Sequence, residues 1–248
     1  MDQAQFGRHG IVGDRAYALI DAETGKVVSA KSVKRFPDLL MCGAVYLEPP
    51  QAGKEIPPVQ ITLTDGTKVN SDSPHADQVL SDFFNRKVRL ARVAPDDFTI
   101  DPRGHRDTSP IPAGSFMDAF PVSVITSSTL DRLSELKPEI NFDVRRFRMN
   151  VVVKTVEAGF VENQWVGKKL SLGKTVSLGV TMPDARCVMT TMAQEDLPKD
   201  ARVLKTLVEH NSLDVAGSGK SPCAGVYAVI GSQGLIRVND SVELLESS

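Results

Sequence analysis

The sequence predicts a mainly β fold with a few helices, that is, an α+β protein, and three observations lead to this prediction. Short apolar runs bounded by turn-forming residues recur along the chain, as in proteins built from antiparallel strands. Apolar residues at helical spacing are confined to a few stretches. The last apolar runs are separated by Asn239-Asp240 and predict a closing β-hairpin, which a barrel needs in order to leave no sheet edge open.

The first predicted elements are a hairpin, further strands and one helix. Turn-forming residues at 23–26 separate two apolar runs, which predicts the hairpin. Ser73 can cap a helix and Pro74 suits its first position. In order, the expected elements are the hairpin of residues 16–21 and 27–28, strands at 41–47 and 59–63, a helix at 74–84 and a strand at 88–93.

Residues 94–117 differ from the rest of the chain in composition. They are rich in proline and glycine, include a polar stretch at 103–109 and show no periodicity. The sequence therefore predicts a long loop or linker, and long loops in compact proteins are often functional.

The second half repeats the β-rich pattern. Ser127 or Ser128 can cap a helix that Pro138 ends, and Gly173-Lys174 suits a hairpin turn. In order, the expected elements are a strand at 122–125, that helix, a strand at 147–153, the hairpin of 169–172 and 175–180, a helix at 202–209, and strands at 226–230, 235–238 and 242–245.

Composition and charge are those of a folded protein and exclude several classes of function. Hydrophobic residues make up 41% of the 248 residues, which allows a real core, and the net charge is −2. Such a charge predicts binding neither to nucleic acid nor to a membrane surface. No apolar run approaches the roughly 18 residues of a membrane span, and the N-terminus has no secretory signal pattern. We therefore expect a soluble, cytoplasmic protein in reducing surroundings.

Cys187 is the first candidate for chemistry. It follows Pro183 and Asp184, which are turn formers placed just after a predicted strand. Arg186 beside it favours the thiolate form of the side chain, and a thiolate suits a soft, redox-active metal. A buried and inert cysteine is the commoner state of this residue type, and it stays the alternative interpretation.

The other cysteines and the histidines give weaker signals. Cys42 lies inside a strand-like run and is expected in the core, whereas Cys223 lies among small residues and either packs there or lines a site. The three cysteines form no C-x-x-C pair, which argues against a zinc ribbon and a disulfide scaffold. The histidines are scattered, so neither a histidine metal site nor a serine hydrolase is expected.

The second candidate is the arginine-rich segment 145–150. In an extended strand, Arg146, Arg148 and Asn150 would share one face. Guanidinium groups bind phosphate through parallel hydrogen bonds, and an asparagine amide can bind the edge of a heterocycle. The alternative interpretation is a solvated charged face, which the apolar run at 151–153 makes less satisfactory.

The third candidate is the turn that contains Gly13, Asp14 and Arg15. Gly10 and Gly13 permit a tight backbone, but the segment is not G-x-G-x-x-G and no βαβ unit surrounds it. A dinucleotide site is therefore excluded. The alternative interpretation is a turn with a surface ion pair.

These segments, in this order, resemble the MOSC family, particularly its amidoxime-reducing branch. No single motif is decisive, but together they cover nearly the whole chain. The matching segments are Gly13-Asp14-Arg15, Asp118 with residues 119–121 ahead of a strand, residues 146–150, residues 165–167 with Leu170 and Gly173, residues 186–191, residues 204–207, and residues 234–240.

The resemblance implies a barrel-like MOSC domain at residues 96–248 behind a smaller N-terminal β domain at residues 1–95. Molybdenum cofactor (molybdopterin) would bind between them. The resemblance also implies that Cys187 ligates molybdenum and is the catalytic residue. The cofactor-binding residues that it implies are Arg15, Asp118, Arg148, Asn150 and Arg186.

Two segments depart from the family pattern. The family usually has a strand and a Pro-Val-Lys-Ser segment ahead of the Gly-Asp-Arg, and no such Lys-Ser precedes Asp14, so we expect an N-terminal domain shortened at its start. The D-P-x-T-G of the family is replaced by residues 192–196, which is expected to alter the rim of the pocket. No ferredoxin-like cysteine cluster follows the barrel, so electrons or sulfur are expected from a separate protein.

Three functions stay open from the sequence. The first is an oxidoreductase that removes oxygen from N-hydroxylated small molecules, with electrons from a ferredoxin-like protein or a flavoprotein. The second is a sulfur carrier in which Cys187 bears a persulfide for metal–sulfur cluster assembly or cofactor sulfuration. The third is a non-catalytic β-barrel binding module with inert cysteines.

Overall fold

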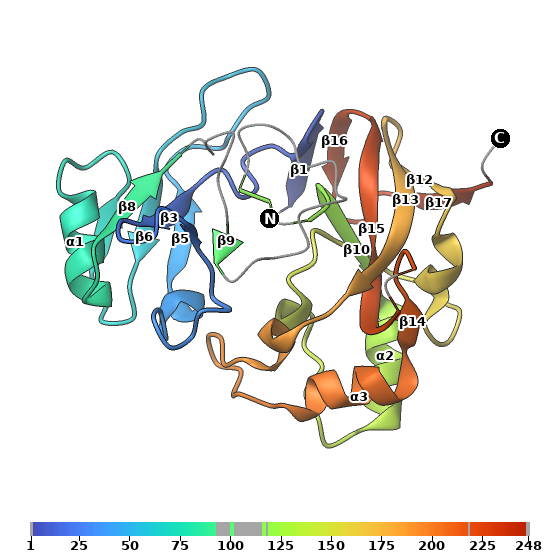
Figure 1. The fold of residues 1–248 in the computed structure, drawn as a ribbon. Coiled ribbons are helices and arrows are strands. Elements are labelled where there is room, and N and C mark those ends of the chain that lie inside the picture. Colours follow the sequence, from blue (N-terminus) through green and yellow to red (C-terminus); the bar gives the residue numbers. More distant parts are fainter. Residues whose placement is uncertain (1, 93–99, 102–115, 118, 218, 247–248) are drawn as a thin grey trace. The chain divides into compact units, whose positions relative to one another are not determined.

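The computed structural model describes residues 2–92, 100–101, 116–117, 119–217 and 219–246 (Figure 1). The chain divides into two compact units, a larger unit of Met1–Ile11 with Phe120–Ser248 and a smaller unit of Val12–Ala119. Both units are built mainly from strands with few helices, which confirms the predicted α+β class. Most of the predicted loop at 94–117 lies outside the described residues.

The larger unit is centred on a seven-stranded sheet in the order β11-β10-β15-β13-β12-β17, with β14 paired to β15. The long strands β13 and β15 are antiparallel, and their pairing shifts register at three places. Such irregularities bend a strand, and the sheet curls in a barrel-like manner (Figure 1). The strands are β10 (Val122–Thr126), β11 (Val151–Val153), β12 (Lys169–Leu172), β13 (Val176–Ala185), β14 (Ser212–Asp214), β15 (Lys220–Ser232) and β17 (Val242–Leu245).

A three-stranded sheet joins the two ends of the chain in the larger unit. It contains β1 (Gln3–Gly7), β2 (Gly10–Ile11) and β16 (Gly234–Arg237) in the order β16-β1-β2. The hairpin that the sequence predicts between residues 235–238 and 242–245 is wrong, because β16 pairs with β1 and β17 pairs with β12. The Asn239-Asp240 turn instead connects β16 of the three-stranded sheet with β17 of the seven-stranded sheet.

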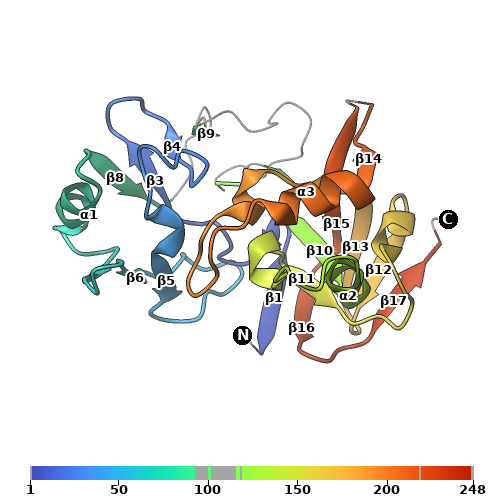
Figure 2. The ribbon, with the colours of Figure 1, turned by 90° about the horizontal axis from the view of Figure 1, so that it is seen from below.

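The core of the larger unit lies between these sheets and two helices. α2 (Ser127–Leu136) and α3 (Arg202–His210) lie side by side (Figure 2), and Leu133, Val203 and Leu207 pack in one buried cluster. α2 is capped by Thr126, whose hydroxyl accepts the backbone N–H of Thr129 at 3.2 Å. The cap therefore lies one residue ahead of the predicted serines.

In its described residues, the smaller unit contains two sheets, in the orders β8-β3-β4-β9 and β5-β6-β7, and one α-helix. Ile20 pairs with Val27, which confirms the first predicted hairpin. The helix begins at Ala76 rather than at residue 74, because Ser73 and Pro74 form a turn ahead of it. The elements are β3 (Ala18–Asp21), β4 (Val27–Val28), η1 (Leu39–Met41), β5 (Gly43–Tyr46), β6 (Val59–Thr62), β7 (Lys68–Asn70), α1 (Ala76–Phe84), β8 (Val88–Ala91) and β9 (Ile100–Asp101).

The strand predicted at residues 147–153 is shorter in the structure and covers only residues 151–153. Val144–Phe147 forms the 3-10 helix η2, and β11 begins only at Val151. Asp143 caps η2 by accepting the backbone N–H of Arg145 at 2.9 Å, and Arg148 then adopts the left-handed conformation with φ 52°. The predicted alternation of Arg146, Arg148 and Asn150 along one strand face is therefore wrong. Two further 3-10 helices are η3 (Val161–Trp165) and η4 (Val188–Thr191).

The units differ in their bounds from the predicted domains at residues 1–95 and 96–248. Pairing of β1 with β16 assigns residues 3–7 to the larger unit, and composition gave no signal of this long-range pairing. The division into domains at residues 1–95 and 96–248 stays a prediction. Within the described residues, none of the helices is long and apolar enough to cross a membrane.

Candidate functional site

The backbone holds Cys187 at a corner between a strand and a 3-10 helix. β13 ends at Ala185, and Cys187 occupies the N-cap position of η4 with an extended backbone (φ −121°, ψ −174°). Its carbonyl accepts the backbone N–H of Thr190 at 3.2 Å and the Thr190 hydroxyl at 3.1 Å. The residue itself is exposed. A corner anchored through its backbone thus presents a thiol to solvent, which confirms the predicted position at the end of a strand.

The other two cysteines lie in different surroundings. Cys223 is fully buried on β15, and its thiol donates to the Ser221 carbonyl at 3.2 Å. Burial raises the pKa of the Cys223 thiol to about 11, so this side chain stays protonated at neutral pH. Cys42 is half-buried, and burial raises its pKa as well. Both therefore behave as structural residues, and Cys187 is the exposed thiol of the three.

Arg186 faces inward beside Cys187. Its Nη1 donates to Asp184 Oδ2 at 2.5 Å, and its Nη2 donates to the Phe147 carbonyl at 2.6 Å. Asp184 is fully buried. Burial by itself would lower the pKa of the Arg186 guanidinium, but the neighbouring Asp184 carboxylate reverses this and leaves the pKa raised. The charge of Arg186 is therefore compensated within the protein.

The arginines of the second candidate segment separate into three environments. Arg146 is fully buried, and it donates to the carbonyls of Asn141 and Pro198 at 2.9 Å each. Arg148 follows η2 and is exposed. Arg145 forms ion pairs that are described next. Of these side chains, Arg148 is the one whose exposure and position suit an anionic ligand.

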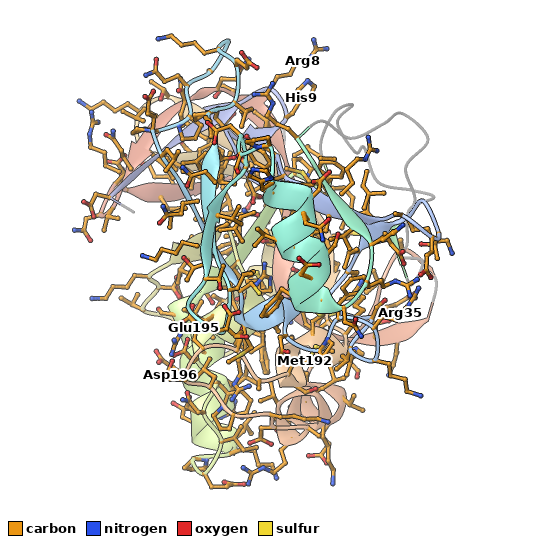
Figure 3. The ribbon with its side chains drawn as sticks, turned by 90° about the vertical axis from the view of Figure 1, so that its left-hand side faces the viewer. Arg8, His9, Arg35, Met192, Glu195 and Asp196 are labelled. Atoms are coloured by element: carbon orange, nitrogen blue, oxygen red, sulfur yellow. The ribbon has the colours of Figure 1, made fainter. Side chains whose placement is uncertain are left out.

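Arg145 connects η2 to the loop that follows η4. Its guanidinium pairs with Asp143 at 2.8 Å and with Glu195 and Asp196 at 2.6 Å each. Figure 3 shows Glu195 and Asp196 beside each other on this loop. The loop is the segment 192–196 that departs from the family pattern, and Arg145 holds it against η2.

Asn150 is fixed at the entrance to β11. Its Oδ1 accepts the backbone N–H and the hydroxyl of Ser123 at 3.0 Å each, and its backbone N–H donates to the Ser123 carbonyl at 3.1 Å. Ser123 belongs to β10, so Asn150 is oriented by the neighbouring strand. The sequence offered no signal for this role of Ser123, because the two residues are far apart along the chain.

The structure brings the Cys187 corner and the Arg148 segment together within the larger unit. η2 and η4 are in contact, and the hydrogen bond from Arg186 to Phe147 ends on the residue that directly precedes Arg148. Asp184 supports this link, although sequence reasoning took it only as a turn former. Its position two residues before Arg186, close enough for an ion pair, was a usable signal.

The other two predicted site residues are Arg15 and Asp118. Arg15 lies in the smaller unit in a turn with φ 50°, and its carbonyl accepts the backbone N–H of Phe116 at 3.1 Å. Gly13 in the same turn has φ 87°, and a Cβ there would lie 2.7 Å from Pro50 Cγ. Asp118 lies outside the described residues.

The donor chemistry of the site fits one kind of group best. Cys187 offers a single sulfur donor, which suits a soft, redox-active metal, and Arg148 offers a guanidinium for a phosphate. A single cysteine sulfur, on a segment in contact with that of an exposed arginine, is the donor set expected for a metal that is carried by an anionic organic cofactor. One such sulfur donor does not match the four ligands of a zinc ribbon.

Comparison with known proteins identifies the family. The MOSC domain model matches residues 112–243, and the chain belongs to the MOSC domain family. The chain is 25% identical over 263 residues to the mouse protein "Mitochondrial amidoxime-reducing component 1", covering 96% of this chain and 74% of that protein. It is 29% identical over 136 residues to the human protein of the same name, covering 53% of this chain and 39% of the human protein.

Proposed function

We propose that the protein binds molybdenum cofactor through Cys187 and reduces N-hydroxylated small molecules, with electrons from a separate donor protein. The observation that carries this proposal is the exposed Cys187 thiol on a backbone-fixed corner, inside the region that matches the MOSC domain. The names of the mouse and human relatives describe amidoxime reduction, which supports the substrate class.

Different residues would bind the metal and the organic part of the cofactor. Cys187 would ligate molybdenum, while Arg148 and Asn150 would hold the pterin and its phosphate, with Arg15 and Asp118 as further contacts. Arg186, whose two Nη groups already donate to Asp184 and Phe147, would support the site without contacting the cofactor. Bound cofactor would supply the two-electron redox chemistry. Overall, an N–O bond is cleaved with two electrons and two protons, which yields the reduced nitrogen compound and water.

Metal and pterin analysis of the purified protein tests this proposal. After expression in a host that makes the cofactor, the wild-type protein is expected to carry molybdenum and pterin near one equivalent each. Cys187→Ser is expected to lose most of the molybdenum, because the sulfur ligand is removed, while Cys42→Ser retains it. The proposal is overturned if the wild-type protein carries no molybdenum or if Cys187→Ser carries as much as wild type.

The same exposed thiol favours a second candidate, a sulfur carrier with a Cys187 persulfide. Intact mass after mild sulfur loading would then show one added sulfur that maps to Cys187 and disappears in Cys187→Ser. A protein that carries neither molybdenum nor added sulfur, and whose ligand binding is unchanged in Cys187→Ala, would be the non-catalytic binding module.

A further inference from the structure

The chain contains the triplet Asp-Ala-Arg twice, and the two copies lie in different environments. In both, the arginine pairs with the aspartate two residues earlier, Arg186 with Asp184 at 2.5 Å and Arg202 with Asp200 at 2.7 Å. The Arg186 side chain is only 12% exposed, whereas the Arg202 side chain is 56% exposed. The second triplet begins α3, where Asp200 also accepts the backbone N–H of Arg202. In the first triplet, Arg186 has a second partner, the carbonyl of Phe147.

The hydrogen bond from Arg186 to Phe147 connects the Cys187 corner with the Arg148 segment. Arg186 is bonded covalently to Cys187, and its Nη2 donates to the carbonyl of Phe147, which precedes Arg148. Arg148 has φ 52°, a conformation that non-glycine residues adopt only when their surroundings hold it. The side chain of the residue that precedes Cys187 thus contacts the backbone of the residue that precedes Arg148.

Arginine suits this double contact and lysine does not. The planar guanidinium offers donors in a rigid fork, so it can serve a carboxylate and a carbonyl at once. Asp184 is fully buried and compensates the charge, and charge-assisted hydrogen bonds of this kind are among the stronger ones in proteins. A lysine at position 186 could keep the charge pair with Asp184 but would lose the second, oriented bond.

We propose that Arg186 is a positioning residue that holds Cys187 and Arg148 at a fixed separation, so that a metal bound to the thiol and a phosphate bound to the guanidinium belong to one cofactor. The inference rests on the proposed function. It differs from direct cofactor binding by Arg186, because both Nη groups already have protein partners. Arg186 therefore acts through its chain neighbour Cys187 and through Arg148, the chain neighbour of its partner Phe147.

Hydrogen exchange on the cofactor-free full chain tests the physical link. The backbone N–H groups of Arg148 and Thr190 donate within the two segments and report on each. Arg186→Lys is expected to accelerate exchange in both segments about tenfold, the equivalent of one lost hydrogen bond of ordinary strength. Arg202→Lys, the matched control, leaves both unchanged. Acceleration in neither segment, or in only one, overturns the proposal. If Arg186→Lys fails to fold, Asp184→Asn serves the same comparison.

The rate at which molybdenum is released from the loaded protein tests whether this positioning strengthens cofactor binding. Arg186→Lys and Arg148→Lys are each expected to speed release about tenfold, and the double variant is expected to release no faster than the faster single variant. Residues that act through one another are non-additive in this way. Effects that multiply would show that Arg186 contacts the cofactor independently, and would overturn the positioning role. If the wild-type protein binds no molybdenum, the proposed function fails, whereas the exchange experiment still decides whether Arg186 links the segments.

Discussion

Glu162 on η3 is fully buried, and its carboxyl group lies against the N-terminal end of α2. Its Oε atoms accept the hydroxyls of Thr126 and Thr129 at 2.7 to 2.8 Å. Burial outweighs these hydrogen bonds and raises the pKa of Glu162 above 4.5. The folded state therefore binds this proton more tightly than the unfolded state. The resulting stability is fully present below pH 4.5 and is lost as the pH rises through the folded pKa.

Glu162→Gln is accordingly expected to be at least as stable as wild type at neutral pH, because the neutral amide removes the cost of a buried charge. Its advantage should shrink as the pH falls toward 4.5, the ordinary value for this group. Denaturant unfolding at both pH values measures this. Glu135→Gln, an exposed change on α2, should shift stability by less than about 0.5 kcal/mol. A large loss of stability in Glu162→Gln at neutral pH would contradict the expectation.

Single residues of the site were predictable where the signal was local. The corner at Cys187 follows from Pro183 and Asp184, which mark the end of a strand, and the structure has the corner there. Arg146 was not predictable, because the carbonyls that receive its guanidinium belong to Asn141 and Pro198. Sequence alone cannot show that a charged side chain will find such partners in the core.

At the scale of elements, the sequence was informative where a turn signal separates two apolar runs. Gly173-Lys174, between the runs that became β12 and β13, gave the correct pairing of these two strands. The short stretch ahead of β11 has the same strand-like composition, yet Asp143 caps η2 there and the chain turns. A local cap outweighs weak strand propensity in such a short segment.

Gly225 gives a prediction for the central strand β15. It has φ 81°, and a Cβ there would lie 2.5 Å from the Val124 carbonyl oxygen and 2.7 Å from Met149 Cε. Gly225→Ala is therefore expected to cost about 2–4 kcal/mol of unfolding free energy, from the strained φ and from overpacking together. Because Met149 precedes Asn150, the variant should also lose cofactor more readily.

Gly167→Ala is the matched control for this prediction. Gly167 has φ 84°, and nothing lies within 4 Å of its Cβ position, so only the conformational cost of about 1 kcal/mol is expected. Denaturant unfolding compares the two variants. Equal losses of unfolding free energy would mean that β10 and Met149 move aside without cost. The close packing of β15 on β10 would then not explain the glycine at position 225.

For the whole molecule, the family resemblance implied two domains with a boundary near residue 95, but it could not show which strands belong to which. The proline- and glycine-rich residues 94–117 predicted a long loop or linker. The structure instead assigns residues 1–11 to the larger unit, since β1 pairs with β16. Such pairing joins segments at opposite ends of the chain, and no local pattern of residues encodes it.

Two phenylalanines test this division. Phe6 on β1 is 1% exposed and packs with Val122 and Leu178 of the larger unit, whereas Phe36 is 2% exposed and packs with Leu80 of the smaller unit. Each change to alanine is expected to cost about 3–5 kcal/mol in its own unit. Hydrogen exchange should therefore quicken mainly in residues 122–185 for Phe6→Ala, and mainly in residues 59–91 for Phe36→Ala. If Phe6→Ala instead loosened residues 59–91, β1 would depend energetically on the smaller unit, and the boundary near residue 95 would describe the molecule better than the pairing of its strands does.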